Sequence, residues 1–229
     1  MVGSISISGV SKHFVNPTGE RITALDNVSL DIPAGSFVSL IGPSGCGKST
    51  LGRTIIQLHK ATAGTVEYQG RNIFELKGAE LKALKKDIQM VFQDPYGSLD
   101  PTKSILSVLA EPIKEYNLLP KEKIYDRACE LIKQVGLNEY DLQKYPHEFS
   151  GGQRQRIVVA RALAMQPKII VCDEPVSALD VSVQAQILNL LKRLQNELGV
   201  SFLFIAHGMA VVKHISDRAA VMYLGKIVE

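Results

Sequence analysis

Hydrophobic and polar residues alternate along the first third of the chain as they do in half-buried strands. Residues 28–32 alternate strictly, residues 36–41 form a short apolar run that ends at Gly42, and residues 65–68 form another short run before a turn at Gly70. Period-two alternation and short apolar runs bounded by turn residues predict β-strands. We therefore expect a strand-rich first third.

The middle of the chain changes to a helical period. Apolar residues recur there at helical spacing and Gly136 follows as a stop signal: Ile124, Ala128, Leu131, Ile132 and Val135. In the last third, residues 168–172 and 201–205 are apolar runs, and an apolar helical stripe over residues 183–198 separates them and ends at Gly199. Strand, helix and strand with short connections predict a parallel α/β sheet, here with an inserted helical lobe.

The composition excludes several classes of protein and kinds of site. With 229 residues, 45% of them hydrophobic, and a net charge of +3, the chain is a globular protein rather than a disordered or collagen-like one. Its lysines are spread out, so we expect no nucleic-acid partner. Cys46, Cys129 and Cys172 form no CxxC pair, which indicates neither a disulfide framework nor a zinc site. No run approaches about 18 apolar residues, and residues 1–10 show no basic region followed by an apolar core, so we expect no secretory leader. We expect a cytoplasmic protein that does not itself enter a bilayer.

Residues 42–49 match the phosphate-loop pattern GxxxxGKS/T, between an expected strand and a helix that begins at Lys48. Glycines allow the backbone N–H groups to face an anion, Lys48 supplies charge for the β- and γ-phosphates, and the Ser49 hydroxyl is a ligand for Mg²⁺. A plain glycine-rich turn is the alternative, but pattern and context both agree with a phosphate site. Cys46 is interpreted as a tolerated small residue. The expected nucleotide-binding residues are Gly42, Pro43, Ser44, Gly45, Cys46, Gly47, Lys48, Ser49 and Thr50.

Two carboxylates, Asp173 and Glu174, follow the apolar run at residues 168–172. Ligands bind at the carboxyl ends of parallel strands, and successive strand residues point to opposite sides. We expect Asp173 to join Ser49 as a ligand of Mg²⁺ and Glu174 to act as the base toward the attacking water. A solvated pair at a strand end is the alternative interpretation.

A further motif, Phe149 followed by residues 150–153, precedes an apolar helical run. Ser150 is a candidate N-cap, and Gly151 and Gly152 allow close approach of an anion. This segment resembles LSGGQ, the signature of the ATP-binding subunits of ABC transporters. Together with the phosphate loop and the acidic pair, it makes the chain resemble that family over residues 14–229. Phe149 replaces the usual leucine.

This resemblance implies an α/β P-loop NTPase fold with a RecA-like core, an N-terminal antiparallel β subdomain and an inserted α-helical subdomain. We expect residues 1–229 to form one ATPase domain, with residues 1–92 and 161–229 as the nucleotide-binding core and residues 93–160 as the insert. In the family, two subunits pair head to tail around two ATP molecules. Ser150, Gly151, Gly152 and Gln153 of one subunit would then reach the γ-phosphate held by the other.

Other roles follow from the resemblance alone. Gln93 matches the Q-loop glutamine, which senses Mg²⁺ and the attacking water, and Asp180 ends the D-loop that crosses the dimer interface. His207 matches the switch histidine, and Phe14 stands at the aromatic position that stacks on adenine. A core Phe and a structural His are the alternatives for the last two. The expected catalytic residues are Glu174, His207, Gln93 and Lys48.

Residues 93–101 and 176–186 resemble the peptide/nickel importer branch. The expected function is therefore ATP hydrolysis that powers uptake of an oligopeptide, a dipeptide or nickel. Expected partners are a copy of the chain or a sister ATPase, transmembrane permeases and, indirectly, an extracytoplasmic binding protein, with the chain on the cytoplasmic side of the plasma membrane. An exporter-type ATPase, or a soluble ABC ATPase of DNA repair or translation, remains the alternative.

Two departures from the family pattern stand out. Gly208 follows the switch histidine, where the family usually has Asp, and we expect weaker turnover with nucleotide binding retained. Members of this branch also generally continue beyond Glu229, so we expect either a truncated chain or a short relative.

Overall fold

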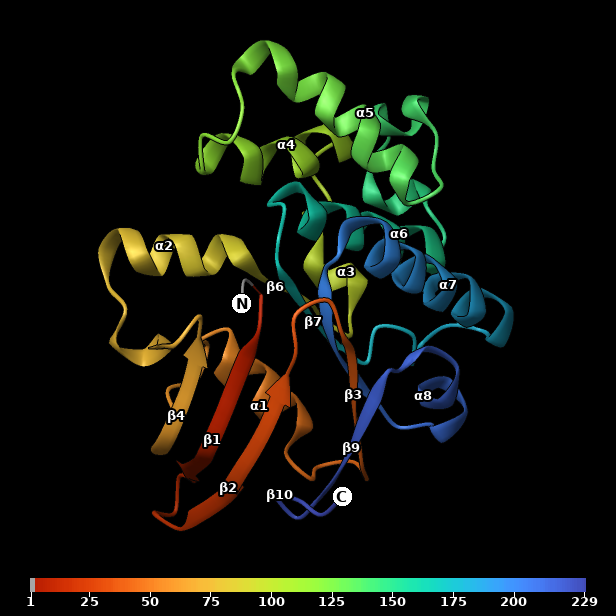
Figure 1. Ribbon diagram of the computed structural model, residues 1–229. Coiled ribbons are helices and arrows are strands. Elements are labelled where there is room, and N and C mark those ends of the chain that lie inside the picture. Colours follow the sequence, from red (N-terminus) through yellow and green to blue (C-terminus); the bar gives the residue numbers. More distant parts are fainter. Residues whose placement is uncertain (1–2) are drawn as a thin grey trace.

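The computed structural model describes residues 3–229, so Met1 and Val2, the first residues of the expected core, lie outside the described residues. The chain builds two sheets and a helical subdomain (Figure 1). The strands are β1 Ile5–Val15, β2 Arg21–Ile32, β3 Phe37–Ile41, β4 Ala63–Tyr68, β5 Arg71–Asn72, β6 Ile88–Val91, β7 Ile169–Asp173, β8 Ser201–Ala206, β9 Arg218–Tyr223 and β10 Lys226–Ile227. The α-helices are α1 Lys48–Ile55, α2 Gly78–Asp87, α3 Pro95–Ser98, α4 Ile105–Glu115, α5 Ile124–Gln134, α6 Gly151–Ala164, α7 Val181–Leu198 and α8 Met209–Ile215.

The larger sheet has six strands in the order β10-β9-β3-β8-β7-β6, and all its pairings are parallel except that of β10 with β9. Every residue of β3, β7 and β8 is buried. Strands buried on both faces read as continuous apolar runs, which is why the sequence pattern located them. Their carboxyl ends meet at one edge of the sheet, and the phosphate loop and the acidic pair follow there directly.

The smaller sheet is antiparallel, in the order β2-β1-β4-β5. Helix α1 packs between it and the larger sheet, with contacts to β2, β7 and β8. Gly52 of α1 permits this approach, because a Cβ there would lie 3.1 Å from both the Ile205 and the Val171 side chains. One apolar cluster joins this sheet, α1 and the facing side of the larger sheet.

The helical subdomain carries α4 and α5, which lie at the top of Figure 1, and the short α3 lies below α6. Helices α4 and α5 pack on each other and on α6, and a second apolar cluster joins them to α7 and to the other side of the larger sheet. The expected boundary at residue 160 falls inside α6, which runs without interruption from Gly151 to Ala164.

The strand and helix expectations are confirmed within one or two residues at most ends. Gly136 and Gly199 both take left-handed backbone after α5 and α7, with φ of 76° and 65°, as helix-stop glycines do. Helix α7 begins at Val181, before the first residue of the expected stripe, because Asp180 caps it. Among residues 3–229 the three cysteines are free and buried, and no helix is long and apolar enough to cross a membrane.

Candidate functional site

The phosphate loop connects β3 to α1. Gly47 has a φ of 110° and caps α1, and a Cβ on it would lie 2.4 Å from the carbonyl oxygen of Ala24. Only glycine fits this left-handed position, which presses the loop against β2. The loop therefore turns into α1 with its amides at the positive end of that helix, which is the arrangement that binds phosphate.

Lys48 is buried, with 4% of its surface exposed. Its Nζ donates to the carbonyl oxygens of Gly42, at 2.8 Å, and Pro43, at 3.0 Å, and lies 3.9 Å from the Cys46 sulfur. No carboxylate of the described residues forms an ion pair with it. Because no carboxylate competes for it, the Lys48 ammonium is available to an anion.

Ser49 and Asp173 meet at the carboxyl edge of the sheet. The Ser49 hydroxyl donates to Oδ1 of Asp173 at 2.7 Å, and Asp173 is 3% exposed. A hydroxyl and a carboxylate are hard oxygen donors of the kind that Mg²⁺ prefers. Among residues 3–229 no cluster of three His, Cys, Asp or Glu side chains could hold a metal alone. The pair therefore fits a magnesium ion that takes its other ligands from phosphate and water.

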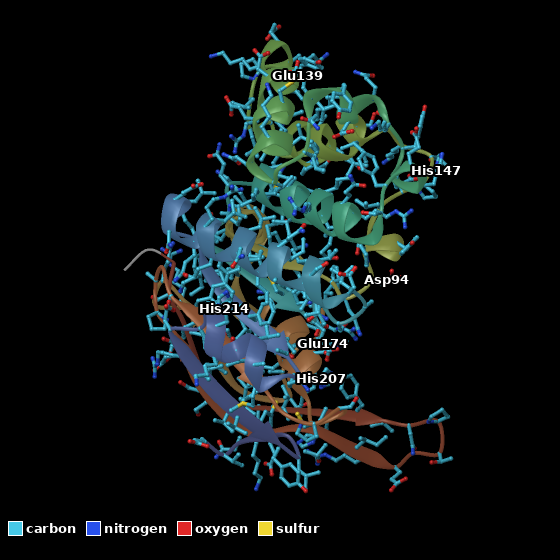
Figure 2. All side chains as sticks on the ribbon, turned by 90° about the vertical axis from the view of Figure 1, so that its right-hand side faces the viewer. Asp94, Glu139, His147, Glu174, His207 and His214 are labelled. Atoms are coloured by element: carbon cyan, nitrogen blue, oxygen red, sulfur yellow. The ribbon has the colours of Figure 1, made fainter. Side chains whose placement is uncertain are left out.

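Glu174 and His207 meet across the ends of β7 and β8, with Oε1 2.5 Å from Nε2 (Figure 2). Glu174 has a φ of 50°, a left-handed conformation that costs a non-glycine residue about 1 kcal/mol. Its N–H donates to the carbonyl oxygen of Ile205 at 3.1 Å, and its own carbonyl accepts from the Ser177 hydroxyl. These bonds hold the turn that sends the Glu174 carboxylate away from the Asp173 side and toward His207.

Gln93 follows β6, and its amide donates to the Ser177 hydroxyl at 3.3 Å. Gln93 also lines a cavity at the carboxyl edge of the larger sheet. The cavity measures about 380 Å³ and brings together most of the expected residues of the phosphate and catalytic machinery. Its lining consists of Ala24, Ser44, Gly45, Gly47, Lys48, Ser49, Thr50, Gln93, Glu174 and His207.

The signature segment lies at the start of α6. Ser150 and Gln153 form a capping box, in which the Ser150 hydroxyl accepts from the Gln153 N–H at 3.3 Å and the Gln153 side chain accepts from the Ser150 N–H. A Cβ on Gly152 would lie 2.3 Å from Val183, so this glycine lets α6 and α7 approach closely. None of residues 150–153 lines the 380 Å³ cavity. The two anion-binding helix ends of the chain therefore do not share one cavity.

Asp180 caps α7 by accepting from the Val183 N–H at 3.0 Å and from the Ser182 hydroxyl at 2.7 Å. The Val183 N–H and then the Ser182 hydroxyl lower the pKa of its carboxyl. Asp180 is thus ionised and solvent-exposed at the start of α7, beside the turn that carries Ser177. It does not line the cavity either.

Phe14 also lies outside that lining. It is partly buried on β1, opposite Ile22 of β2, and its ring meets the edge of the His59 ring. Ala24 of β2 is the lining residue that sequence patterns did not single out, because its role there is close backbone contact with Gly47 and no side-chain chemistry marks it.

Comparisons with known proteins agree with this geometry. The ABC transporter family model matches residues 25–177. The chain is 52% identical to the oligopeptide transport ATP-binding protein OppF of Salmonella typhimurium over 98% of the chain and 70% of that protein. It is 50% identical to the glutathione import ATP-binding protein GsiA of Pectobacterium atrosepticum over 94% of the chain, but it spans only 34% of the length of GsiA.

A solved structure gives the same result for the fold. The dimeric post-hydrolysis state of the ATP-binding cassette MJ0796, bound to ADP and phosphate, superposes with a TM-score of 0.87 at 34% identity, over 98% of this chain and 97% of that one. The expected fold class is thereby confirmed. By motif, geometry and likeness, the chain belongs to the ABC transporter family and forms its ATP-binding domain.

Proposed function

We propose that this chain is the ATP-hydrolysing subunit of an importer that takes up peptides. The observation that carries the proposal is the convergence of Lys48, the Ser49–Asp173 pair, the Glu174–His207 pair and Gln93 on one edge of the parallel sheet. Anion charge, a metal site, a base and a water-orienting amide are the parts that hydrolysis of a phosphoanhydride needs.

In the proposed reaction, water attacks the γ-phosphorus of ATP and the bond from that phosphorus to the bridging oxygen of ADP breaks. Glu174 accepts a proton from the water, and His207, 2.5 Å away, is positioned to release the carboxylate and turn toward the γ-phosphate. Lys48 exchanges the carbonyl oxygens of Gly42 and Pro43 for phosphate oxygens. Gln93, as a neutral amide, both donates and accepts and can orient the water.

Ser49 and Asp173 would hold Mg²⁺, which supplies Lewis-acid stabilisation of the charge that develops on the phosphate oxygens. Phe14 would stack on the adenine. These assignments are supported by the bond between Ser49 and Asp173 and by the match of Phe14 to the aromatic position of the family.

The separation of the signature helix from the phosphate loop supports a head-to-tail pair of subunits. Ser150, Gly151, Gly152, Gln153 and Asp180 would complete the γ-phosphate site of the partner, which is a second copy or a sister ATPase. The dimeric MJ0796 cassette with ADP and phosphate is in line with this arrangement.

A peptide cargo is supported by the names of the relatives, which are an oligopeptide transporter subunit and a glutathione importer subunit. Nickel, which the branch resemblance includes, is the competing outcome. The chain would work at the cytoplasmic side of the plasma membrane, bound to transmembrane permeases that an extracytoplasmic binding protein loads.

The test is co-purification of the chain with its permeases, followed by reconstitution and an ATPase assay with and without cargo-loaded binding protein. Stimulation by a peptide-loaded binding protein supports the proposal. Stimulation by nickel alone, or the absence of any permease in the purified complex, would contradict the peptide importer assignment. Glu174→Gln serves as the inactive control.

A further inference from the structure

The ring of Phe14 is held by a histidine from another part of the chain. His59 lies in the segment that follows α1, and its ring meets the Phe14 ring edge-on, with centroids 5.3 Å apart and planes at 82°. The Nζ of Lys12, two residues before Phe14 on β1, lies 5.0 Å from the centre of the same ring. Both Phe14 and His59 stay partly accessible to solvent.

The segment that carries His59 is fastened to β1 directly beside this contact. Lys12 Nζ donates to the carbonyl oxygen of Lys60 at 2.9 Å. The His13 N–H donates to the Thr62 hydroxyl at 3.1 Å, and the Thr62 N–H donates to a carbonyl oxygen of β1. The position of the His59 ring against Phe14 is therefore fixed by the backbone of two elements.

Helix α1 connects this contact to the phosphate loop. The N–H groups of Leu58 and His59 both donate to the carbonyl oxygen of Arg53, in the last turn of α1, at 2.9 and 3.2 Å. The first residue of α1 is Lys48 of the phosphate loop. His59 thus links the aromatic ring to a short rigid helix whose other end binds phosphate.

The charge state of His59 suits ring packing. Partial burial, then Lys12, then Arg53 lower the pKa of its imidazole, so the ring is neutral at pH 7. A neutral ring can stand beside the Lys12 ammonium without repulsion and present its edge to the aromatic face.

We propose that His59 is a positioning residue for the nucleotide base: it holds the Phe14 ring at a set distance from the phosphate loop, so that base and triphosphate bind together. This inference rests on the proposed function, in which Phe14 stacks on adenine. His59 does not touch the phosphates, so its effect is confined to ligands that carry a base.

The test compares two ligands by calorimetric titration: ATP, and tripolyphosphate, which has the phosphates without the base. His59→Ala is expected to weaken ATP binding about three- to tenfold, the size of one lost aromatic edge contact, and to leave tripolyphosphate binding unchanged. His59→Phe keeps a ring edge and is expected to restore most of the ATP affinity. His214→Ala, at a surface histidine bonded to Asn189, is the matched control and should change neither.

Phe14→Ala separates the two levels of the proposal. If Phe14→Ala weakens ATP binding and His59→Ala does not, the inference about His59 is wrong, while the assignment of Phe14 to stacking on adenine stands. If Phe14→Ala has no effect on ATP binding, Phe14 does not stack on adenine and the inference about His59 is wrong as well. Equal weakening of ATP and tripolyphosphate by His59→Ala, in a protein that still unfolds cooperatively, would show a merely structural role and overturn the inference.

Discussion

Gly208 gives the sharpest prediction about this chain, because it follows His207 at a position where the resemblance predicts Asp. Gly208 is the N-cap of α8, in extended backbone at φ −102° and ψ 123°, and no side chain caps that helix. A Cβ there would meet nothing within 4 Å, and the residue borders a cavity of about 350 Å³ with Ser177 and Gln184. Gly208→Asp therefore fits without strain.

The expected gain in stability combines three small terms. An aspartate cap exceeds glycine by a few tenths of a kcal/mol, loss of glycine freedom in the unfolded chain adds about 0.4–1 kcal/mol, and a negative charge at a helix N-terminus adds about 0.3–1 kcal/mol. A total of about 1–2 kcal/mol raises Tm by about 2–8 °C in a chain of this size. Thermal unfolding measures it, with Gly208→Asn as the uncharged control.

The functional expectation for Gly208→Asp is faster turnover at unchanged ATP affinity. A carboxylate in this cavity can accept the second hydrogen of the Gln184 amide, whose first is donated to Leu179, and so connect the residue after His207 to α7. One such hydrogen bond is worth about 0.5–1.5 kcal/mol, which bounds the gain in ATPase rate at about two- to tenfold. A steady-state ATPase assay that compares Gly208→Asp with Gly208→Asn and with the unsubstituted protein tests this expectation. An unchanged rate, in a variant that shows the gain in Tm, would refute the reasoning that the missing carboxylate slows turnover.

Three further predictions concern named side chains. Lys48→Met is expected to raise the Kd for ATP at least about tenfold, because charged hydrogen bonds to phosphate are lost, and unchanged affinity in a titration would contradict the assignment. Ser49→Ala leaves the buried Asp173 without its 2.7 Å donor, so the free energy of unfolding should fall by about 1–3 kcal/mol in denaturant titrations, whereas an unchanged midpoint would show that water replaces the hydroxyl. The pKa of His59 is lowered in the folded chain, so as pH falls the unfolded chain binds a proton at His59 before the folded chain does. The free energy of unfolding therefore decreases as pH falls from about 6.5 through the lower pKa of the folded state. His59→Phe should flatten this loss in unfolding titrations between pH 7 and 5, and a slope identical to the unsubstituted protein would refute the shift.

Much of the fold followed from periodicity because the chain uses strong local signals. The buried strands β3, β7 and β8 read as apolar runs, and α7 carries an apolar stripe that ends at Gly199. The phosphate loop and the acidic pair were located because their chemistry requires fixed spacing beside a strand end. The meeting of Ser49 with Asp173 followed from the rule that parallel strands end at one edge.

Other features depend on contacts between distant segments and leave no periodic signal. Ala24 lines the cavity only because Gly47 approaches its backbone, and His59 meets Phe14 only because α1 returns the chain to β1. The left-handed turn at Glu174 is likewise set by hydrogen bonds to Ile205 and Ser177 rather than by its own residue type.

The most direct test of the central claim is the oligomeric state and turnover of Glu174→Gln with ATP and Mg²⁺. The substitution keeps the size of the side chain and removes the base, so the variant should bind ATP, fail to hydrolyse it and elute as a closed dimer in size-exclusion chromatography with ATP but not with ADP. The unsubstituted protein with ADP is the control. Robust ATP hydrolysis by Glu174→Gln would contradict the account, whereas a variant that binds ATP and stays monomeric would exclude a second copy of this chain as the partner and leave a sister ATPase.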